Sequence, residues 1–169
     1  IERRSLLDGR KLTRWRESVP IPTYCMVVGA AEFSVTGSAS PSGIPLEFYA
    51  YPQDADAASR KFKRSNLMLQ FFAERVGPYP YEKLAQVEAT TTIGGMENSS
   101  AIFYTESLFQ NDSPGEFPVA HETAHQWFGD SITPQDWDHL WLSEGFATYF
   151  ETLFYEALEE KETTKQRMA

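Results

Sequence analysis

Two histidines and two glutamates in the second half of the chain have the spacing of a metal-dependent hydrolytic site. His121 and His125 are four residues apart, so on a helix their imidazoles lie on one face and can bind one ion. Glu122 lies beside them, where it can reach a water in the open position of the metal without acting as a ligand. A catalytic zinc usually has three protein ligands, and Glu144, 19 positions after His125, is the candidate for the third.

The alternative interpretation of this motif is a helix that carries two solvated histidines. A chance His-Glu-x-x-His in a chain of this size has a probability on the order of one per cent or less. The chain holds three histidines, and two of them fall in the motif. We therefore predict a metal site formed by His121, His125 and Glu144, with Glu122 as the general base that acts on a metal-bound water.

Two helices joined by a short loop are needed to bring these residues together. The first predicted helix carries His121 to Phe128, with Pro118 in its first turn and a stop near Gly129. The second runs from Asp136 to about Lys161 and contains Glu144. Residues 112–118 are predicted to be a turn-rich lead-in to the first helix.

The part of the chain before these helices is predicted to be rich in strands. Residues 21–51 contain many β-branched and aromatic residues and predict two or three strands, and residues 84–92 and 101–104 have strand character as well. Asp54 to Val76 predicts a single amphipathic helix that Gly77-Pro78 ends. Strands in the first part and helices in the second indicate the α+β class.

The composition is that of a globular protein and argues against two classes of partner. Hydrophobic residues make up 41% of the chain and aromatic residues 14%, enough to bury a core. The formal net charge of −9 argues against a nucleic-acid footprint and against an anionic membrane surface. No run approaches the roughly 18 apolar residues of a membrane helix, and residues 1–4 are not typical of a signal peptide. Cys25, the single cysteine, leaves no intramolecular disulfide and is predicted to be a buried thiol.

Several motifs together resemble the one-zinc aminopeptidases of the gluzincin clan, which include alanyl aminopeptidases and leukotriene hydrolase. Glu144 lies within Trp141-Leu142-Ser143-Glu144-Gly145-Phe146-Ala147, which is similar to the third-ligand segment of that family. Gly94-Gly95-Met96-Glu97-Asn98 is similar to its exopeptidase signature, Gly-x-Met-Glu-Asn. Trp127-Phe128-Gly129-Asp130 and Pro20-Ile21-Pro22-Thr23-Tyr24 extend the resemblance over nearly the whole chain.

The resemblance implies an enzyme that binds one Zn²⁺ per chain and releases amino-terminal residues from peptides. Glu97 would pair with the free α-ammonium of the substrate, which explains trimming of ends in place of internal cleavage. The backbone of Gly94 and Gly95 would hold the peptide like an added strand, and Met96 and Asn98 belong to the same substrate-binding signature, with Asn98 the weaker candidate for a contact.

The resemblance also implies that residues 1–169 are part of a thermolysin-like catalytic domain, an α+β fold in which a small mixed β-sheet packs against the helices that carry the zinc ligands. Residues 1–20 are expected to be the tail of a preceding β-rich domain or a linker, 21–110 the sheet-rich part with one helix, and 111–169 the zinc-binding helices. The remaining domains of the parent protein are expected outside this segment. Asp138 is the candidate for an acid that hydrogen-bonds a zinc-bound imidazole, and a surface aspartate at a helix start is the alternative.

Alternative activities stay open at this point. The family uses a tyrosine well downstream of the third zinc ligand to stabilise the oxyanion, and this chain ends 25 residues after Glu144. Loss of an oxyanion donor typically costs on the order of a hundredfold to a thousandfold in rate, so an inactive metal-binding segment is one alternative. A gluzincin with epoxide-hydrolase or endopeptidase activity is another. Two imidazoles and a carboxylate also accept cobalt or manganese, so zinc rests on the resemblance.

Overall fold

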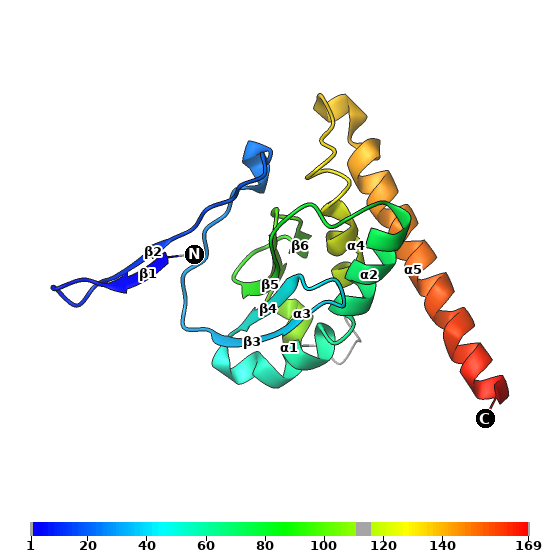
Figure 1. Ribbon diagram of the computed structural model, residues 1–169, viewed down its shortest axis with the longest axis horizontal. Coiled ribbons are helices and arrows are strands. Elements are labelled where there is room, and N and C mark those ends of the chain that lie inside the picture. The colour runs from blue at the N-terminus through cyan, green and yellow to red at the C-terminus, as the bar shows by residue number, and fades with distance from the viewer. Residues whose placement is uncertain (1, 111–115, 169) are drawn as a thin grey trace.

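The computed structural model describes the backbone of residues 2–110 and 116–168. A five-stranded sheet lies at the centre, the longer helices gather on one side of it, and a hairpin at the amino end extends away from the body (Figure 1). Residue 111, where the predicted zinc-binding part begins, and residues 112–115 of the predicted turn lie outside the described residues.

The central sheet is mixed, as the sequence predicts for an α+β protein. Along the sheet, the strands follow the order β3 (Ser34–Ala39), β4 (Pro45–Ala50), β5 (Leu84–Ala89), β7 (Ala101–Thr105) and β6 (Gly95–Met96). β3 and β4 are antiparallel, β4, β5 and β7 are parallel, and β6 is antiparallel to β7. β6 therefore lies at one edge of the sheet, and it belongs to the Gly94–Asn98 segment.

The first third of the chain contains a hairpin and the first two strands of the central sheet, within the two or three strands predicted for residues 21–51. A separate two-stranded hairpin consists of β1 (Glu2–Ser5) and β2 (Lys11–Arg14). It is followed by the short helix η1 (Thr23–Cys25), and Cys25 is buried as predicted. Residues 26–33 form no strand, so β3 and β4 are the strands found between residues 21 and 51.

The single helix predicted for Asp54 to Val76 is wrong, because the chain forms separate helices there. The short helix η2 (Pro52–Asp54) leads into α1 (Ala55–Lys61), and α2 (Ser65–Arg75) begins after a break at residues 62–64. At the break, the ring of Phe62 packs against Phe48, Tyr104 and Phe109, with centroids 5.5 to 5.7 Å apart. After it, α2 packs against the helices of the second half of the chain.

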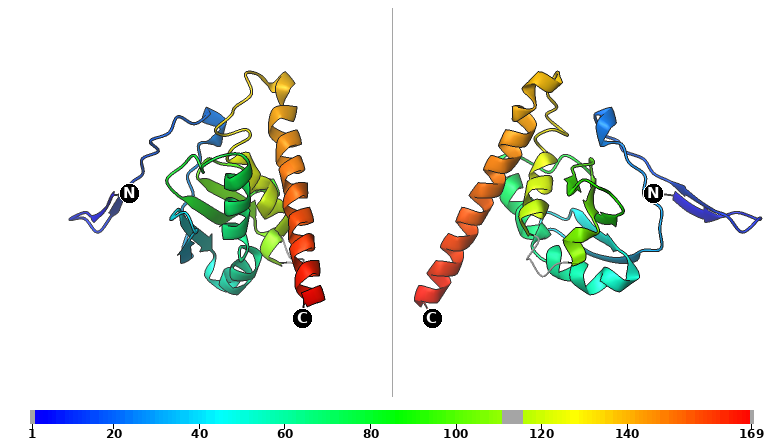
Figure 2. Two further views of the ribbon diagram at one scale, coloured as in Figure 1. Left: turned by 45° about the vertical axis from the view of Figure 1, so that its right-hand side comes forward. Right: turned by 180° about the vertical axis from the view of Figure 1, so that it is seen from behind.

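The second half of the chain supplies the helices that carry the predicted ligands. They are α3 (Ser107–Gln110), α4 (Glu116–His125), η3 (Trp137–His139) and α5 (Trp141–Met168). α4 packs along the first part of α5, and the far end of α5 extends beyond the body (Figure 2). α4 ends at His125, earlier than predicted, and residues 126 and 127 continue as a turn. Residues 116–118, predicted as part of a turn, belong to α4.

The hydrophobic core fills the space between the sheet and α2, α4 and α5. Phe72 on α2 has ring contacts with Trp127, Phe150 and Phe154. Leu84, Ile102 and Tyr104 of the central strands are fully buried on the same core. This packing fixes α4 relative to α5 and to the edge strand β6.

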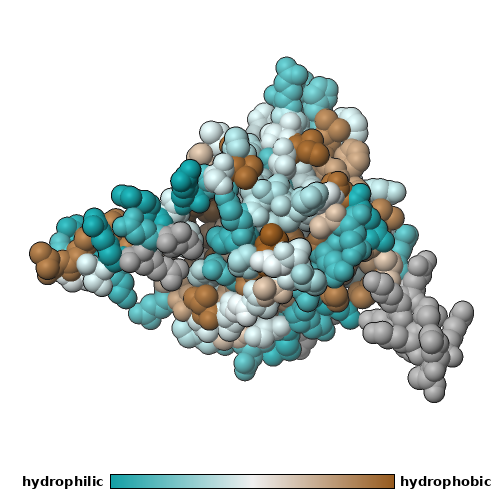
Figure 3. Space-filling model, viewed as in Figure 1, coloured by the Kyte–Doolittle hydropathy of each residue, from teal (hydrophilic) through white to brown (hydrophobic). Residues whose placement is uncertain are grey.

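Hydrophobic side chains also reach the surface, most plainly at the tip of the β1–β2 hairpin, where Leu7 is fully exposed (Figure 3). Within the residues that the structure describes, none of the helices combines the length and the apolar character that a bilayer crossing requires.

Candidate metal centre

Three side chains from α4 and α5 converge on one point. His121 and His125 are one helical turn apart on α4, and their Nε2 atoms are 3.0 Å apart. Glu144, in the first turn of α5, places its Oε2 3.3 Å from Nε2 of His121 and 3.5 Å from Nε2 of His125. The structure thus brings together the three ligands that the sequence suggested, although 19 residues separate His125 from Glu144.

The second ring nitrogen of each histidine is held by an oxygen. Nδ1 of His121 donates to Oε2 of Glu151 at 3.1 Å. Nδ1 of His125 donates to the backbone carbonyl of Phe128 at 2.9 Å, and Oγ of Ser143 lies 3.1 Å from the same nitrogen. In a neutral imidazole whose proton is on Nδ1, the Nε2 lone pair is free to bind a metal, and here both Nε2 atoms lie beside the Glu144 carboxylate.

The sequence predicted Asp138 next to a zinc-bound imidazole, and the structure places Glu151 there. Asp138 is exposed in η3. Glu151 lies seven residues after Glu144, two turns along α5 and therefore on the same face. This spacing was the sequence signal that could have identified Glu151.

Gly129 makes room for Ser143 beside His125. Its backbone has φ of 113°, a conformation that favours glycine, and a Cβ at this position would lie 2.4 Å from Oγ of Ser143. The glycine in the turn after α4 thus allows α5 to approach α4 closely.

Glu122 points from α4 toward the edge of the sheet. Its side chain is 8% exposed, and none of the described residues forms a hydrogen bond or ion pair with its carboxylate. A Cβ on Gly95 would lie 2.3 Å from Oε1 of Glu122, so only glycine in β6 lets this carboxylate sit against the strand. Burial raises the pKa of Glu122 to about 7, which suits a general base that must accept a proton near neutral pH.

Glu97 brings a further carboxylate to the same place. Ligand atoms of Glu97, Glu122 and His125 all lie within 4.8 Å of one another. Glu97 follows β6 directly, and the β6 edge that faces away from β7 carries no further strand of the described sheet. The Gly94–Asn98 segment, defined here as residues 94–98, therefore places a carboxylate and an unpaired strand edge beside the ligand cluster. Asn98 is buried, and its side chain donates to the backbone carbonyl of Cys25 at 3.3 Å.

The pKa shifts show that the cluster has an excess of negative charge. Burial lowers the pKa of His125, but the hydrogen bond with Glu144 and the charges of Glu97 and Glu122 outweigh it and raise that pKa to about 9. The hydrogen bond to Glu151 raises the pKa of His121. The hydrogen bond with His125 lowers the pKa of Glu144. A site with these shifts attracts cations.

The residues present fit a zinc ion. A tetrahedral site with bonds of about 2.0 to 2.2 Å has ligand atoms roughly 3.3 to 3.6 Å apart. The three distances in this cluster, 3.0, 3.3 and 3.5 Å, are close to that range. Two imidazoles and one carboxylate also leave a fourth position open, as catalytic zinc sites do.

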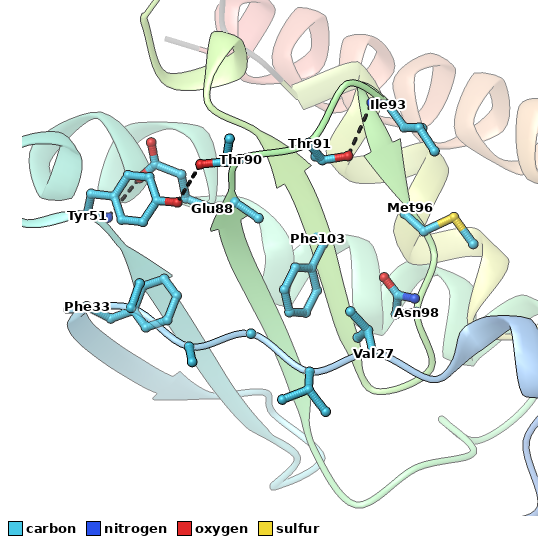
Figure 4. Close-up of a pocket in the computed structure, with 15 residues that line it drawn as sticks. Val27, Phe33, Tyr51, Glu88, Thr90, Thr91, Ile93, Met96, Asn98 and Phe103 are labelled. Atoms are coloured by element: carbon cyan, nitrogen blue, oxygen red, sulfur yellow. Dashed lines mark hydrogen bonds between the residues drawn. The ribbon is translucent and has the colours of Figure 1, made fainter.

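A cavity of about 430 Å³ lies apart from the ligand cluster. It lies between residues 27–33 and the face of the sheet, where Val27, Phe103 and Met96 approach one another (Figure 4). Met96 and Asn98 line this cavity, so the cavity adjoins the Gly94–Asn98 segment. We place the chemistry at the ligand cluster, because the donor atoms converge there.

Comparison with known proteins points in the same direction. The Peptidase family M1 domain matches residues 60–169. The chain is 33% identical to a glutamyl aminopeptidase of Bitis rhinoceros and to an aminopeptidase A of Gloydius brevicauda, each over 173 residues that cover 95% of this chain and 18% of the relative. It is also 33% identical to the glutamyl aminopeptidase of Rattus norvegicus, over 90% of this chain and 18% of that protein. The chain thus spans less than a fifth of the length of these relatives.

Proposed function

This chain belongs to peptidase family M1, and from that membership we propose that it forms the metal-binding part of a zinc aminopeptidase. The observation that carries the proposal is the convergence of His121, His125 and Glu144, with ligand atoms 3.0 to 3.5 Å apart. The names of the relatives, glutamyl aminopeptidase and aminopeptidase A, support an enzyme that acts on peptides.

We propose that His121, His125 and Glu144 hold one zinc ion per chain. When bound, the ion supplies a positive charge that lowers the pKa of a coordinated water and polarises the substrate carbonyl. Glu151, Phe128 and Ser143 fix the orientation of the two imidazoles, so the ligand atoms are arranged before the metal binds.

Glu122 acts as the general base in this proposal. Its buried carboxylate accepts a proton from the attacking water while the water oxygen forms a bond to the scissile carbonyl carbon. Glu122 then donates that proton to the nitrogen of the leaving amine as the carbon–nitrogen bond breaks. Contact with Gly95 keeps the carboxylate against β6 and next to the cluster.

Glu97 and the edge strand bind the substrate. The carboxylate of Glu97 pairs with the free α-ammonium of the peptide, and its closeness to Glu122 and His125 places the first peptide bond at the metal. The backbone of Gly94, Gly95 and Met96 lies at the open edge of the sheet and can hold the peptide as an added strand. Asn98 supports this segment through its bond to Cys25.

At the level of domains, we propose that residues 1–169 are part of a thermolysin-like catalytic domain. The hairpin within residues 1–20 would belong to a preceding β-rich domain or linker, residues 21–110 form the sheet-rich part, and residues 111–169 carry the zinc helices. The chain covers 18% of its relatives, which supports further domains in the parent protein.

Two alternatives make different predictions. A metal-binding segment that lacks the downstream oxyanion tyrosine binds zinc and does not cleave peptides. An endopeptidase or epoxide hydrolase of the same clan does not depend on a free amino terminus. Amine dependence therefore separates the proposed aminopeptidase from the second alternative, and cleavage itself separates it from the first.

The test measures zinc content and hydrolysis of an amino-acid amide reporter in the complete protein that carries this chain, and in the 169-residue chain alone. We expect near-stoichiometric zinc, cleavage by the complete protein, and loss of cleavage both in Glu122→Gln and with an acetyl-blocked reporter. If the 169-residue chain binds zinc but does not cleave the reporter, residues needed for catalysis lie outside this chain. Absence of zinc from both proteins would disprove the ligand assignment.

A further inference from the structure

We propose that Gln126 is a positioning residue that holds residues 97–100 against the zinc helix, so that the carboxylate of Glu97 stands at a set distance from Glu122. Gln126 directly follows the ligand His125, and its side chain is 0% exposed. This inference rests on the proposed function, because it concerns recognition of the substrate ammonium by Glu97.

The side-chain amide of Gln126 is hydrogen-bonded through both its oxygen and its nitrogen. Its Oε1 accepts from the backbone N–H of Ser100 at 2.8 Å and from the hydroxyl of Tyr79 at 3.1 Å. Its Nε2 donates to the backbone carbonyl of Glu97 at 3.2 Å and to Oδ2 of Asp130 at 2.9 Å. The orientation of the amide is unambiguous, because the Ser100 N–H can only donate and the Glu97 carbonyl can only accept.

Residues 97–100, which Gln126 contacts, have little regular structure of their own to hold them in place. β6 consists of two residues, and the chain turns directly after it, with Asn98 N–H donating to the carbonyl of Met96 at 2.8 Å. Ser100 has φ of 62°, and it is the non-glycine residue with positive φ in the described part of the chain. Such a conformation costs about 1 kcal/mol or more and persists only where surrounding contacts determine it. The bond from Ser100 N–H to Gln126 is one such contact.

Asp130, which accepts a hydrogen bond from Gln126, is itself held by a second buried contact. Oδ1 of Asp130 accepts from the thiol of Cys25 at 3.0 Å, and Asp130 is 1% exposed. The backbone carbonyl of Cys25 in turn accepts from the side chain of Asn98 at 3.3 Å. Nε2 of Gln126 also lies 3.5 Å from the backbone carbonyl of Asn98, so Gln126, Asp130, Cys25 and Asn98 form a closed ring of contacts between η1, the end of α4 and the turn after β6. Because the ring is buried, each lost bond leaves an unpaired polar group.

This arrangement separates the role of Gln126 from that of the ligands. The side chain of Gln126 contacts the backbone of Glu97 and Ser100 but neither the metal-binding nitrogens nor Glu144. Loss of the amide should therefore shift Glu97 and weaken ammonium binding, while the ligand cluster and Glu122 keep their places. Such a change raises KM more than it lowers kcat.

The experiment compares Gln126→Met with Gln86→Met in the complete protein. Gln86 is the matched control because it is also a fully buried glutamine, but its Oε1 accepts from Tyr104 within the central strands, at 2.7 Å. For Gln126→Met we expect KM for an unblocked amino-acid amide to rise about tenfold or more, with kcat within about threefold of the wild type. Zinc content should be unchanged in both variants. A purely structural role would reduce the active fraction, and therefore kcat, without a change in KM.

Amide exchange provides a readout that does not depend on activity. We expect the Ser100 N–H to exchange slowly in the wild type and faster in Gln126→Met, and to be unaffected in Gln86→Met. Gln126→Asn keeps a buried amide that is one methylene shorter and serves as a second variant if the apolar one does not fold.

An unchanged KM in folded Gln126 variants would overturn the inference, whether or not Ser100 exchange changes. An equal rise of KM in Gln86→Met would overturn it as well. If the wild type binds zinc but cleaves no amide reporter, the proposed function fails, and Ser100 exchange alone still decides whether Gln126 holds this segment.

Discussion

Each imidazole of the ligand cluster is oriented by an oxygen on its far side. Glu151 holds His121, and the Phe128 carbonyl and Ser143 hold His125. These partners fix which nitrogen carries the proton, and so leave Nε2 of both rings available to a metal. The quality of the site therefore depends on residues that would not themselves touch the ion.

At the scale of single residues, Glu151→Gln should weaken zinc binding by about 10- to 100-fold. A neutral amide is a weaker partner for the N–H of His121 than a carboxylate. Competition with a chelator measures the affinity. Glu156→Gln, an exposed glutamate on the same helix, is the matched control, and Asp138→Asn tests the acid predicted from the sequence. Equal affinities of the Glu151→Gln and Glu156→Gln variants would contradict the role of Glu151.

Glu88 on β5 makes stability depend on pH. Its carboxylate is buried and accepts from the backbone N–H of Tyr51 at 2.8 Å, and burial together with nearby Asp54 raises its pKa to about 7. The folded state therefore binds the proton more tightly than the unfolded state does. This contribution to stability is complete below about pH 4.5 and is lost as the pH rises through 7.

We therefore expect Glu88→Gln to gain stability relative to the wild type, by on the order of 2 kcal/mol, as the pH rises from 5 to 8. Urea denaturation of both proteins at the two pH values measures this difference. A difference in the free energy of unfolding that is the same at both pH values would show that Glu88 has no raised pKa.

At the scale of elements, the turn between α4 and α5 decides whether the cluster forms. α4 supplies two of the proposed ligands and α5 the third, and the two helices approach closely where Gly129 faces Ser143. Two glycines in this region differ in whether the structure leaves space for a Cβ. Gly129 has φ of 113° and no space for a Cβ, whereas a Cβ on Gly145 within α5 would meet only a Trp141 carbon at 4.0 Å.

The two glycines should consequently respond to alanine in opposite directions. Gly129→Ala should lower the free energy of unfolding by about 1 to 3 kcal/mol, through backbone strain and the contact with Ser143. Gly145→Ala should raise it by up to about 1 kcal/mol, because alanine is favoured over glycine inside a helix. Thermal or urea unfolding of the two variants tests both signs, and a gain of stability in Gly129→Ala would contradict the geometry of the turn.

At the scale of the whole molecule, the body and the amino-terminal hairpin differ in how they are held. β5 and β7 lie inside the sheet with their side chains largely buried, while β1 and β2 pair with each other away from the central sheet (Figure 1). Contacts between the hairpin region and the body include the hydrogen bond from Ser18 to Glu82 and the approach of Lys83 to the ring of Trp15.

Hydrogen exchange of the 169-residue chain should reflect this difference. We expect the amides of β1 and β2 to exchange at least about a hundredfold faster than those of β5 and β7, because the hairpin can open without unfolding the core. Mass spectrometry of peptic fragments measures both regions in one experiment. Equal protection of the hairpin and the central strands would show that they unfold as one unit.

The sequence by itself determined the features that depend on local spacing. His121 and His125 lie on one face because the helical period is local, and the richness of residues 21–51 in β-branched and aromatic residues indicated strands there. The Gly94–Asn98 segment and Glu144 belong to motifs that residue order alone identifies, through their resemblance to a family.

Tertiary structure decided the features that depend on packing between distant parts of the chain. The break between α1 and α2 occurs where the ring of Phe62 packs among Phe48, Tyr104 and Phe109. The partnership of Glu151 with His121 needed the register of α5 along α4. The hydrogen bonds that join Gln126 to residues 97–100 form only because η1, α4 and β6 pack against one another. Side-chain contacts of this kind arise only after the elements pack, because no local period relates residues that are dozens of positions apart.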